Sequence, residues 1–246
     1  MVPALILELK CLILLGALAL ASYQDVRTRE IEDKIWLVAG SVGAALTACE
    51  ALAAPAYPLL FALASMGLTA VLAVGVYFLG LYGGADAKAL VVIAVTMPLS
   101  PSSSALYSPF FPLTVLGNAL LCSLVLVPAC LVYNVAWRLS RGRALFGGVR
   151  AGLPARIGAL FTAIKVRPRT ARQVHFNPIE VRHEGGPAGL RLFSRVSDED
   201  EAKDIDDAKE YVWVTPAIPM ILFLLVGFAI AALGADLIFG LLALIL

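Results

Sequence analysis

Two aspartates lie where apolar runs of the chain give way to polar residues, and both are candidates for chemistry. Asp25 follows the first apolar run, and Asp86 follows a Gly-Gly-Ala segment and precedes another apolar run. Ionisable groups in or near membrane segments are costly and tend to be functional. Two neighbouring carboxyls share one proton, so that one acts as a base toward water while the other polarises a carbonyl. Such a pair has the chemistry needed to hydrolyse a peptide bond.

Each aspartate also has a purely structural interpretation. Asp86 stands where a helix N-cap is expected, and aspartate is a favoured cap because it accepts hydrogen bonds from exposed amides. Asp25 is an ordinary juxtamembrane charge beside Arg27 and Arg29. These two arginines suit determinants of membrane topology better than catalytic residues.

Three neighbours of Asp86 are candidate support residues. Gly83 and Gly84 lack a Cβ, so a substrate strand could approach the backbone closely there, and a plain turn before a helix explains them equally well. Lys88 could favour the ionised form of Asp86 or contact the substrate, and the alternative is a lysine that snorkels to the membrane interface.

The composition indicates a membrane protein. Of the 246 residues, 60% are hydrophobic and only 15% are charged, whereas soluble domains carry about 25% charged residues. The net charge of +1 gives no case for a nucleic-acid partner. The cysteines form no Cys-x-x-Cys pair, so neither a zinc ribbon nor a disulfide framework is indicated, and we expect them to be buried in helices.

Hydropathy predicts an all-α integral membrane protein with six transmembrane helices. A span needs about 20 apolar residues, and the candidates are 3–22, 35–54, 58–80, 87–99, 112–136 and 216–235. The first is interpreted as a span and not as a removed signal peptide, because no basic region precedes it and several further apolar runs follow. The apolar tail 237–246 is too short to span alone, and we expect it to prolong the last helix.

The basic residues orient these spans. Segments 23–34, 81–88 and 137–213 hold every lysine and arginine except Lys10, while the alternate loops 55–57 and 100–111 hold none. Basic residues accumulate on the cytoplasmic side. The N-terminus is therefore predicted to lie outside, and both aspartates at the cytoplasmic ends of their helices.

The chain divides into membrane spans 1–136, a soluble cytoplasmic insertion 137–213 and a final span 214–246. Within this α+β insertion, 151–166 suits a helix at the membrane surface, where basic residues attract anionic lipid. Segments 189–196 and 210–214 suit short strands. The acidic stretch 198–207 is interpreted as a solvated helix or loop because it lacks the ligand spacing of a calcium loop.

The two aspartate motifs, the six-span layout and the insertion together resemble the Gly-x-Gly-Asp membrane proteases of the type IV prepilin peptidase family. The archaeal preflagellin (prearchaellin) peptidases are the nearest match. Ala85 departs from the pattern, which has glycine there, and the cytoplasmic four-cysteine zinc module of many bacterial members has no counterpart. The resemblance therefore does not extend to their N-methyltransferase activity.

The resemblance implies an aspartyl endopeptidase with Asp25 and Asp86 as the catalytic residues. Its substrates would be precursors of archaellins or type IV pilin-like proteins, cut between a short basic leader and an apolar helix on the cytoplasmic side. No metal or organic cofactor is implied, and His175 and His183 are too few for a catalytic zinc site with its usual three protein ligands.

Two other classes of protein stay open at this stage. A small transporter or channel could use Asp25 and Asp86 as an ion relay, although relay acids usually lie near mid-membrane. An inactive assembly factor for a pilus machine is the other. Asp236 resembles the second motif, but the topology puts it on the outer side, so we interpret it as a helix-end or turn residue.

Overall fold

The computed structural model describes residues 2–80, 82–101, 108–142, 144–173, 176–183, 186–190, 209–216 and 219–245. The chain forms two compact units. We call Met1–Ser123 with Pro219–Leu246 the helical unit, and Leu124–Ile218 the mixed unit.

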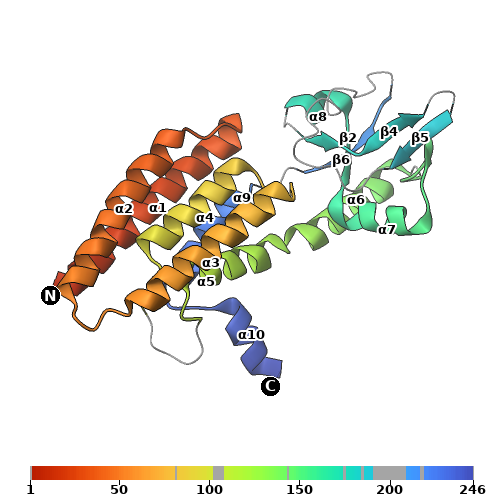
Figure 1. Ribbon diagram of the computed structural model, residues 1–246. Coiled ribbons are helices and arrows are strands. Elements are labelled where there is room, and N and C mark those ends of the chain that lie inside the picture. The colour runs from red at the N-terminus through yellow and green to blue at the C-terminus, as the bar shows by residue number, and fades with distance from the viewer. Residues whose placement is uncertain are drawn as a thin grey trace. The chain divides into compact units, whose positions relative to one another are not determined.

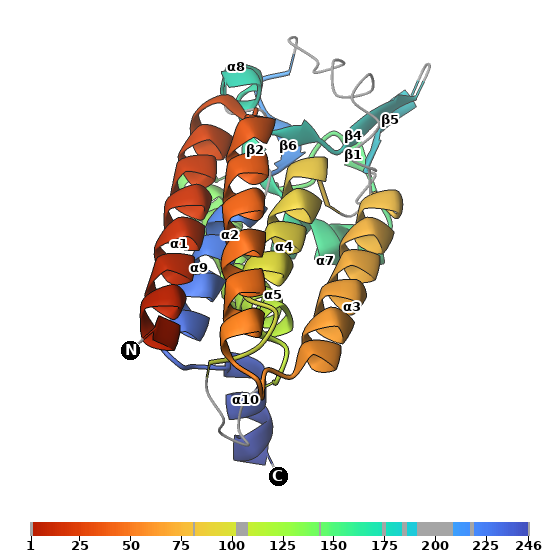
Figure 2. The ribbon, with the colours of Figure 1, turned by 60° about the vertical axis from the view of Figure 1, so that its left-hand side comes forward.

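The helical unit packs antiparallel helices around one apolar core (Figures 1 and 2). Figure 2 shows α1 running from the N-terminus toward the end of the unit at which α2 and α4 begin. The helices are α1 (Val2–Thr28), α2 (Asp33–Ala53), α3 (Leu59–Phe78), α4 (Gly84–Thr96), α5 (Phe111–Ser123), α9 (Met220–Ala232) and α10 (Leu237–Ile245).

The described residues contain four segments that are long and apolar enough to cross a membrane. A fifth is obtained if α9 and α10 count as one broken span. These segments confirm the prediction of a multi-pass helical membrane protein. They do not confirm the predicted number of six spans. The four segments are Ala4–Thr28, Asp33–Ala53, Leu59–Phe78 and Phe111–Arg141, the last of which joins α5 to α6 (Leu126–Arg141).

The apolar tail does not prolong the last helix, so that prediction was wrong. The axes of α9 and α10 differ by 67°, and the chain turns at Gly234, whose φ is +83°. The buried Asp236 carboxylate accepts hydrogen bonds from the Phe239 amide at 3.1 Å and the Thr114 hydroxyl at 2.9 Å. Asp236 is therefore a helix-end residue, as its sequence context indicated.

Helix α4 is short, and hydroxyls from two neighbouring helices donate hydrogen bonds to backbone carbonyls at its C-terminal end. It has 13 residues, which gives a length of about 20 Å. The Thr47 hydroxyl donates to the Thr96 carbonyl at 2.8 Å, and the Ser65 hydroxyl donates to the Pro98 carbonyl at 2.6 Å. The last carbonyls of a helix have no partner within the helix, so these bonds fix the position of α4 along α2 and α3.

Small residues allow the helices to approach closely. A Cβ added at Gly43 of α2 would lie 1.9 Å from the Thr96 Oγ1 atom of α4. One added at Gly227 of α9 would lie 2.5 Å from the Val115 carbonyl oxygen and 2.7 Å from the Ala119 nitrogen, both in α5. Such backbone contact is typical of helix packing in membranes.

Lys10, the exception to the charge asymmetry, is buried and paired. Its ammonium lies 2.5 Å from the Glu50 carboxylate, and this ion pair joins α1 to α2.

The expected burial of the cysteines holds only for Cys130; Cys11 and Cys122 are partly buried and Cys49 is exposed. The reason is that lipid-facing positions of a membrane helix are as apolar as core positions, so an apolar run does not distinguish them.

The mixed unit contains two three-stranded sheets, with strand orders β1-β5-β4 and β2-β6-β3. The predicted helix over 151–166 was wrong at its C-terminal end, because 164–166 pairs antiparallel with β6. The predicted strand 210–214 is confirmed by β6, whereas 191–196 and the acidic stretch 198–207 lie outside the described residues. The elements are α6, β1 (Val149–Arg150), α7 (Leu153–Thr162), β2 (Ile164–Val166), α8 (Pro168–Gln173), β3 (Asn177–Pro178), β4 (Glu180–His183), β5 (Gly186–Leu190) and β6 (Val212–Thr215).

The close approach of α9 to α5 predicts that Gly227→Ala destabilises the protein. The added methyl overlaps backbone atoms that cannot rotate away, and we expect a loss of roughly 1–3 kcal/mol. Gly67→Ala in α3 is the matched control, because nothing lies within 4 Å of the position of its added methyl. Thermal unfolding in detergent measures both variants, and equal melting temperatures would show that the contact is not tight.

Candidate active site

Asp25 continues the core-facing stripe of α1. Leu14, Leu18 and Ala21 are buried in the helical core at spacings of four and three residues, and Asp25 follows four residues later. Residues three and four apart share one face of a helix. The carboxylate, which is 15% exposed, therefore lies at the polar end of the face that packs inward.

The last turn of α1 folds back on Asp25. Arg29 adopts a φ of +60°, and its amide donates to the Asp25 carbonyl at 3.2 Å. Its guanidinium lies 3.8 Å from the Asp25 carboxylate, forming an ion pair between residues i and i+4. This partner was not assigned from the sequence, although the spacing of an acid and a base four apart on a helix was a usable signal.

Asp86 lies in the first turn of α4, but it is not the N-cap, so that part of the structural interpretation was wrong. The N-cap is Gly83, and Asp86 is the third helical residue. The Asp86 carboxylate reaches back and accepts a hydrogen bond from the Gly83 amide at 3.1 Å. Such an acceptor satisfies an amide that the helix leaves unpaired.

The geometry requires no glycine at the two candidate positions. Gly83 has an extended backbone with a φ of −71°, which any residue can adopt. An added Cβ would meet only ordinary contacts, at 3.5 Å from Asp86 for Gly83 and at 3.6 Å from Tyr77 for Gly84. Neither the fold nor helix packing accounts for this pair, so close approach of a substrate stays a prediction.

The structure brings the two aspartates to one end of the helical unit. Helices α1 and α4 pack against each other in the core, and Figure 2 shows the end of α1 and the start of α4 at the same end. Asp86 precedes the predicted fourth span and lies outside the four candidate spans. Burial raises the pKa of Asp86 to about 6; the Gly83 hydrogen bond lowers this pKa, and the negative charge of Asp25 raises it.

Tyr82 lies beside this site and was not identified from the sequence. It packs against the helical core, and its phenol has a pKa raised by burial and by the negative charge of Asp86. Its position directly before the Gly-Gly-Ala-Asp segment was the only available signal.

Lys88 does not pair with Asp86. Its ammonium lies 2.6 Å from the carboxylate of Asp33, the first residue of α2, and both side chains are largely exposed. An exposed pair contributes little to stability. Lys88 thus fits the interface interpretation, and the pair links α4 to α2 beside the two aspartates.

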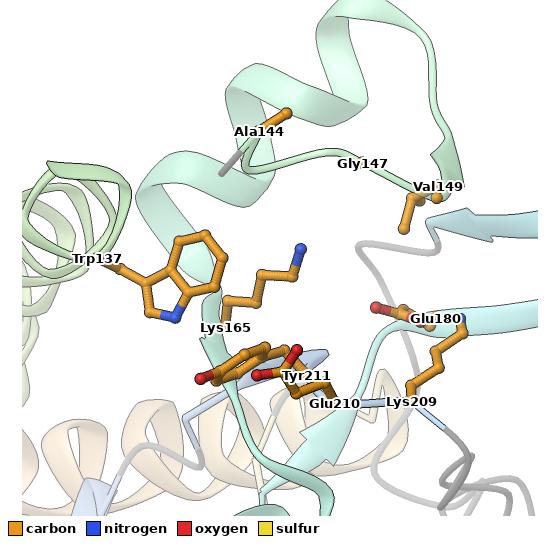
Figure 3. Close-up of a pocket in the computed structure, with 10 residues that line it drawn as sticks. Trp137, Ala144, Gly147, Val149, Lys165, Glu180, Lys209, Glu210 and Tyr211 are labelled. Atoms are coloured by element: carbon orange, nitrogen blue, oxygen red, sulfur yellow. Dashed lines mark hydrogen bonds and ion pairs between the residues drawn. The ribbon is translucent and has the colours of Figure 1, made fainter. Parts of the chain in front are cut away.

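The mixed unit contains a separate cavity of about 350 Å³ (Figure 3). Its Lys165 ammonium donates to the Leu145 carbonyl at 2.9 Å and lies 5.1 Å from the centre of the Trp137 ring. Its Glu180 carboxylate accepts from the Lys209 ammonium at 2.5 Å. Glu180 and Glu210 both line the cavity, and the Glu180 carboxylate also accepts a hydrogen bond from the Trp213 amide at 2.9 Å. Within the described residues, no group of three or more His, Cys, Asp or Glu side chains could hold a metal ion.

Comparison with known proteins confirms the resemblance inferred from the aspartate motifs. The type IV leader peptidase family matches residues 12–127, a segment that includes both aspartates. The chain is similar to the preflagellin peptidases of Methanococcus maripaludis (26% identity, covering 91% of this chain and 94% of that protein) and Methanococcus voltae (26%, 91% and 93%). The preflagellin peptidase of Methanocaldococcus jannaschii is 25% identical, with 92% of this chain and 95% of that protein covered.

The environment of Asp86 predicts a pH-dependent effect of Asp86→Asn on stability. The pKa of the Asp86 carboxyl is about 6 in the folded protein and near 3.9 in the unfolded chain. Above about pH 3.9 the carboxyl therefore ionises more readily in the unfolded chain, and this destabilises the folded protein. The neutral amide removes this cost and can still accept from the Gly83 amide. We therefore expect the variant to be more stable than the parent at pH 8, by up to roughly 3 kcal/mol, and equally stable near pH 4.

Thermal unfolding in detergent at several pH values measures this difference. Glu30→Gln is the control, since Glu30 is an exposed carboxylate in the α1–α2 loop. A variant that melts below the parent at pH 8 would contradict the proposed burial cost.

Proposed function

We propose that this chain, a relative of the type IV leader peptidases, is a membrane-embedded aspartyl endopeptidase with Asp25 and Asp86 as its catalytic residues. It removes the short basic leader from precursors that continue into an apolar helix, such as preflagellins or type IV pilin-like proteins. The observation that carries the proposal is that two carboxyls from different helices, one in the last turn of α1 and one in the first turn of α4, lie at the same end of the helical unit (Figure 2). The family match, which spans both residues, supports the same assignment.

The two carboxyls hydrolyse the peptide bond in different protonation states. The ionised one takes a proton from water as the water oxygen attacks the scissile carbonyl carbon. The protonated one donates a hydrogen bond to the carbonyl oxygen and stabilises the charge that develops there. When the C–N bond breaks, the amine leaves with a proton from the dyad. This chemistry uses only side chains of the chain itself.

The position of the aspartates supports a cut near the membrane surface. Asp25 lies in the last turn of α1 and Asp86 in the first turn of α4. A leader that stays in water while the adjoining apolar helix stays in lipid places its cleavage site at this depth. An ion relay would need acids closer to mid-membrane, so the transporter alternative has less support.

The proposed topology has six spans, with residues 87–99 as a short fourth span. Residues 137–213 form the cytoplasmic insertion, and the aspartates face the cytoplasm. The distribution of basic residues supports this orientation, and the hydroxyl partners at the end of α4 support its placement within the membrane.

The dyad predicts that Asp25→Asn and Asp86→Asn each abolish cleavage while expression and membrane insertion persist. An amide in either position removes the shared proton on which the mechanism depends. The assay incubates the purified protein with a preflagellin and detects the shortened product by mass. Asp236→Asn, at the turn before α10, should retain activity. Comparable cleavage by either dyad variant would show that the assignment is wrong.

The topology predicts which engineered cysteines react with impermeant reagents in intact cells. Cysteines introduced at residues 55–57 or 100–111 should be labelled from outside, whereas those at 140–210 should react only after lysis. The four native cysteines are first replaced by serine or alanine. Labelling of the large loop from outside would put the aspartates on the wrong face for removing a leader before export.

A further inference from the structure

We infer that Arg29 is a positioning residue that keeps Asp25 ionised, so that Asp25 accepts the proton from water while Asp86 holds the proton that the pair shares. This inference rests on the proposed function and deepens it. The sequence alone left open which aspartate is the base, and it gave Arg29 only a role in topology. Four structural observations favour this assignment.

The first observation is the ion pair itself. The Arg29 guanidinium lies 3.8 Å from the Asp25 carboxylate, and the two side chains are only 28% and 15% exposed. Attraction between charges strengthens as water is excluded, so this pair is screened less than a fully exposed one. Its effect is to favour the charged form of Asp25.

The second observation is backbone conformation. Arg29 is the one residue other than glycine with a positive φ in the part of the chain that the structure describes. The left-handed conformation costs a residue with a Cβ about 1–2 kcal/mol, and glycine occupies such positions elsewhere, as at Gly142 and Gly234. Strain of this kind is typical of functional sites. Here it returns the arginine side chain to the carboxylate one turn earlier.

The third observation is where the neighbouring cations are held. Arg27 donates to the Tyr23 hydroxyl and lies over the same ring, and Lys88 pairs with Asp33.

Helix α1 packs against α2, α4 and α9. At this end α2 supplies Asp33 and Lys34, α4 supplies Asp86 and Lys88, and α9 contains no titratable residue. Tyr82 precedes α4. The cation that the structure places on Asp25 is therefore Arg29.

The fourth observation is the environment of Asp86. Its carboxyl accepts one backbone hydrogen bond, from Gly83, and burial raises its pKa to about 6. The helix dipoles act in the opposite sense, since Asp25 lies near the negative end of α1 and Asp86 near the positive end of α4. A dipole contributes about 0.3–1 kcal/mol, whereas a close opposite charge shifts a pKa by about 1–3 units. The Arg29 charge beside Asp25 and the deeper burial of Asp86 therefore outweigh the dipoles.

The resulting sequence balances protons and bonds. Water attacks the carbonyl carbon, its proton passes to Asp25, and the proton of Asp86 passes to the carbonyl oxygen, giving a gem-diol. The diol then returns a proton to Asp86 as its C–N bond breaks and the carboxyl group forms. Asp25 donates its new proton to the departing amine. Both aspartates end in their starting states.

The test measures kcat/KM for preflagellin cleavage against pH. The parent should give a bell-shaped profile, whose rising limb reports the base and whose falling limb reports the acid. In Arg29→Gln the rising limb should move to higher pH by about one unit, while the falling limb stays near its place. Cleavage one unit below the parental midpoint should then fall severalfold.

Three further variants separate charge from backbone effects. Arg29→Lys should restore the parental limb, and Arg29→Gly, which relieves the strained φ but lacks the charge, should behave like Arg29→Gln. Arg27→Gln is the matched control, because it removes an equal charge two residues away that is not paired with Asp25. Its rising limb should stay parental.

Each other outcome overturns the inference. Arg29 would have only the role of ending the helix if the rising limb does not move in Arg29→Gln. The same would follow if Arg29→Gln loses activity equally at every pH and Arg29→Gly restores it. Movement of the falling limb instead would reverse the roles of the aspartates. Asp25→Asn and Asp86→Asn are measured in parallel: if either is active, the proposed function itself fails, whereas inactive dyad variants confine the failure to Arg29.

Discussion

Inside a hydrocarbon layer no water is available to hydrogen-bond an exposed backbone group, and in the proposed topology this constraint decides where α4 can lie. With 13 residues the helix is shorter than the roughly 20 of an ordinary span, so its C-terminal carbonyls need donors within the protein. Thr47 and Ser65 supply them from two neighbouring helices. Because those hydroxyls are fixed on longer helices, the first turn of α4, and Asp86 with it, is held at a defined depth. The position of the site thus depends on bonds made at the opposite end of the helix.

Part of this arrangement is visible in the sequence. Long apolar runs predict α1, α2 and α3, and charge asymmetry together with span parity brings Asp25 and Asp86 to one end. Hydropathy reports only how apolar a segment is, so it could not show the 67° change of direction between α9 and α10. That turn depends on Asn118, which accepts from the Leu237 amide at 2.8 Å and donates to the Ala235 carbonyl at 2.9 Å. A contact between residues more than 100 positions apart leaves no local pattern.

Some of the ion pairs could be predicted from the sequence and others could not. Asp25 lies in the last turn of α1 and Arg29 directly after that helix, four residues later, so their ion pair was within reach of local reasoning. The partner of Lys88 was not, because Asp33 belongs to another helix and Asp86 is far nearer in the sequence. Lys10 is similar: charge counting treats it as an exception, whereas the structure pairs it with Glu50 and buries it. Sequence proximity predicts a partner well within a helix and poorly between helices.

Helix α2 supplies no candidate catalytic residue, yet it connects the two that do. At its start the Glu32 amide donates to the Gln24 side chain at 3.1 Å, one position before Asp25. One residue later Asp33 pairs with Lys88, two positions after Asp86. Farther along, Gly43 and Thr47 both meet Thr96 at the end of α4. Contacts with α4 at both ends of one helix fix its tilt and register, and α1 is joined to α2 by packing and by the Lys10–Glu50 ion pair. Helix α2 therefore helps to hold the two carboxyls in position, because it contacts both the end of α1 and the start of α4.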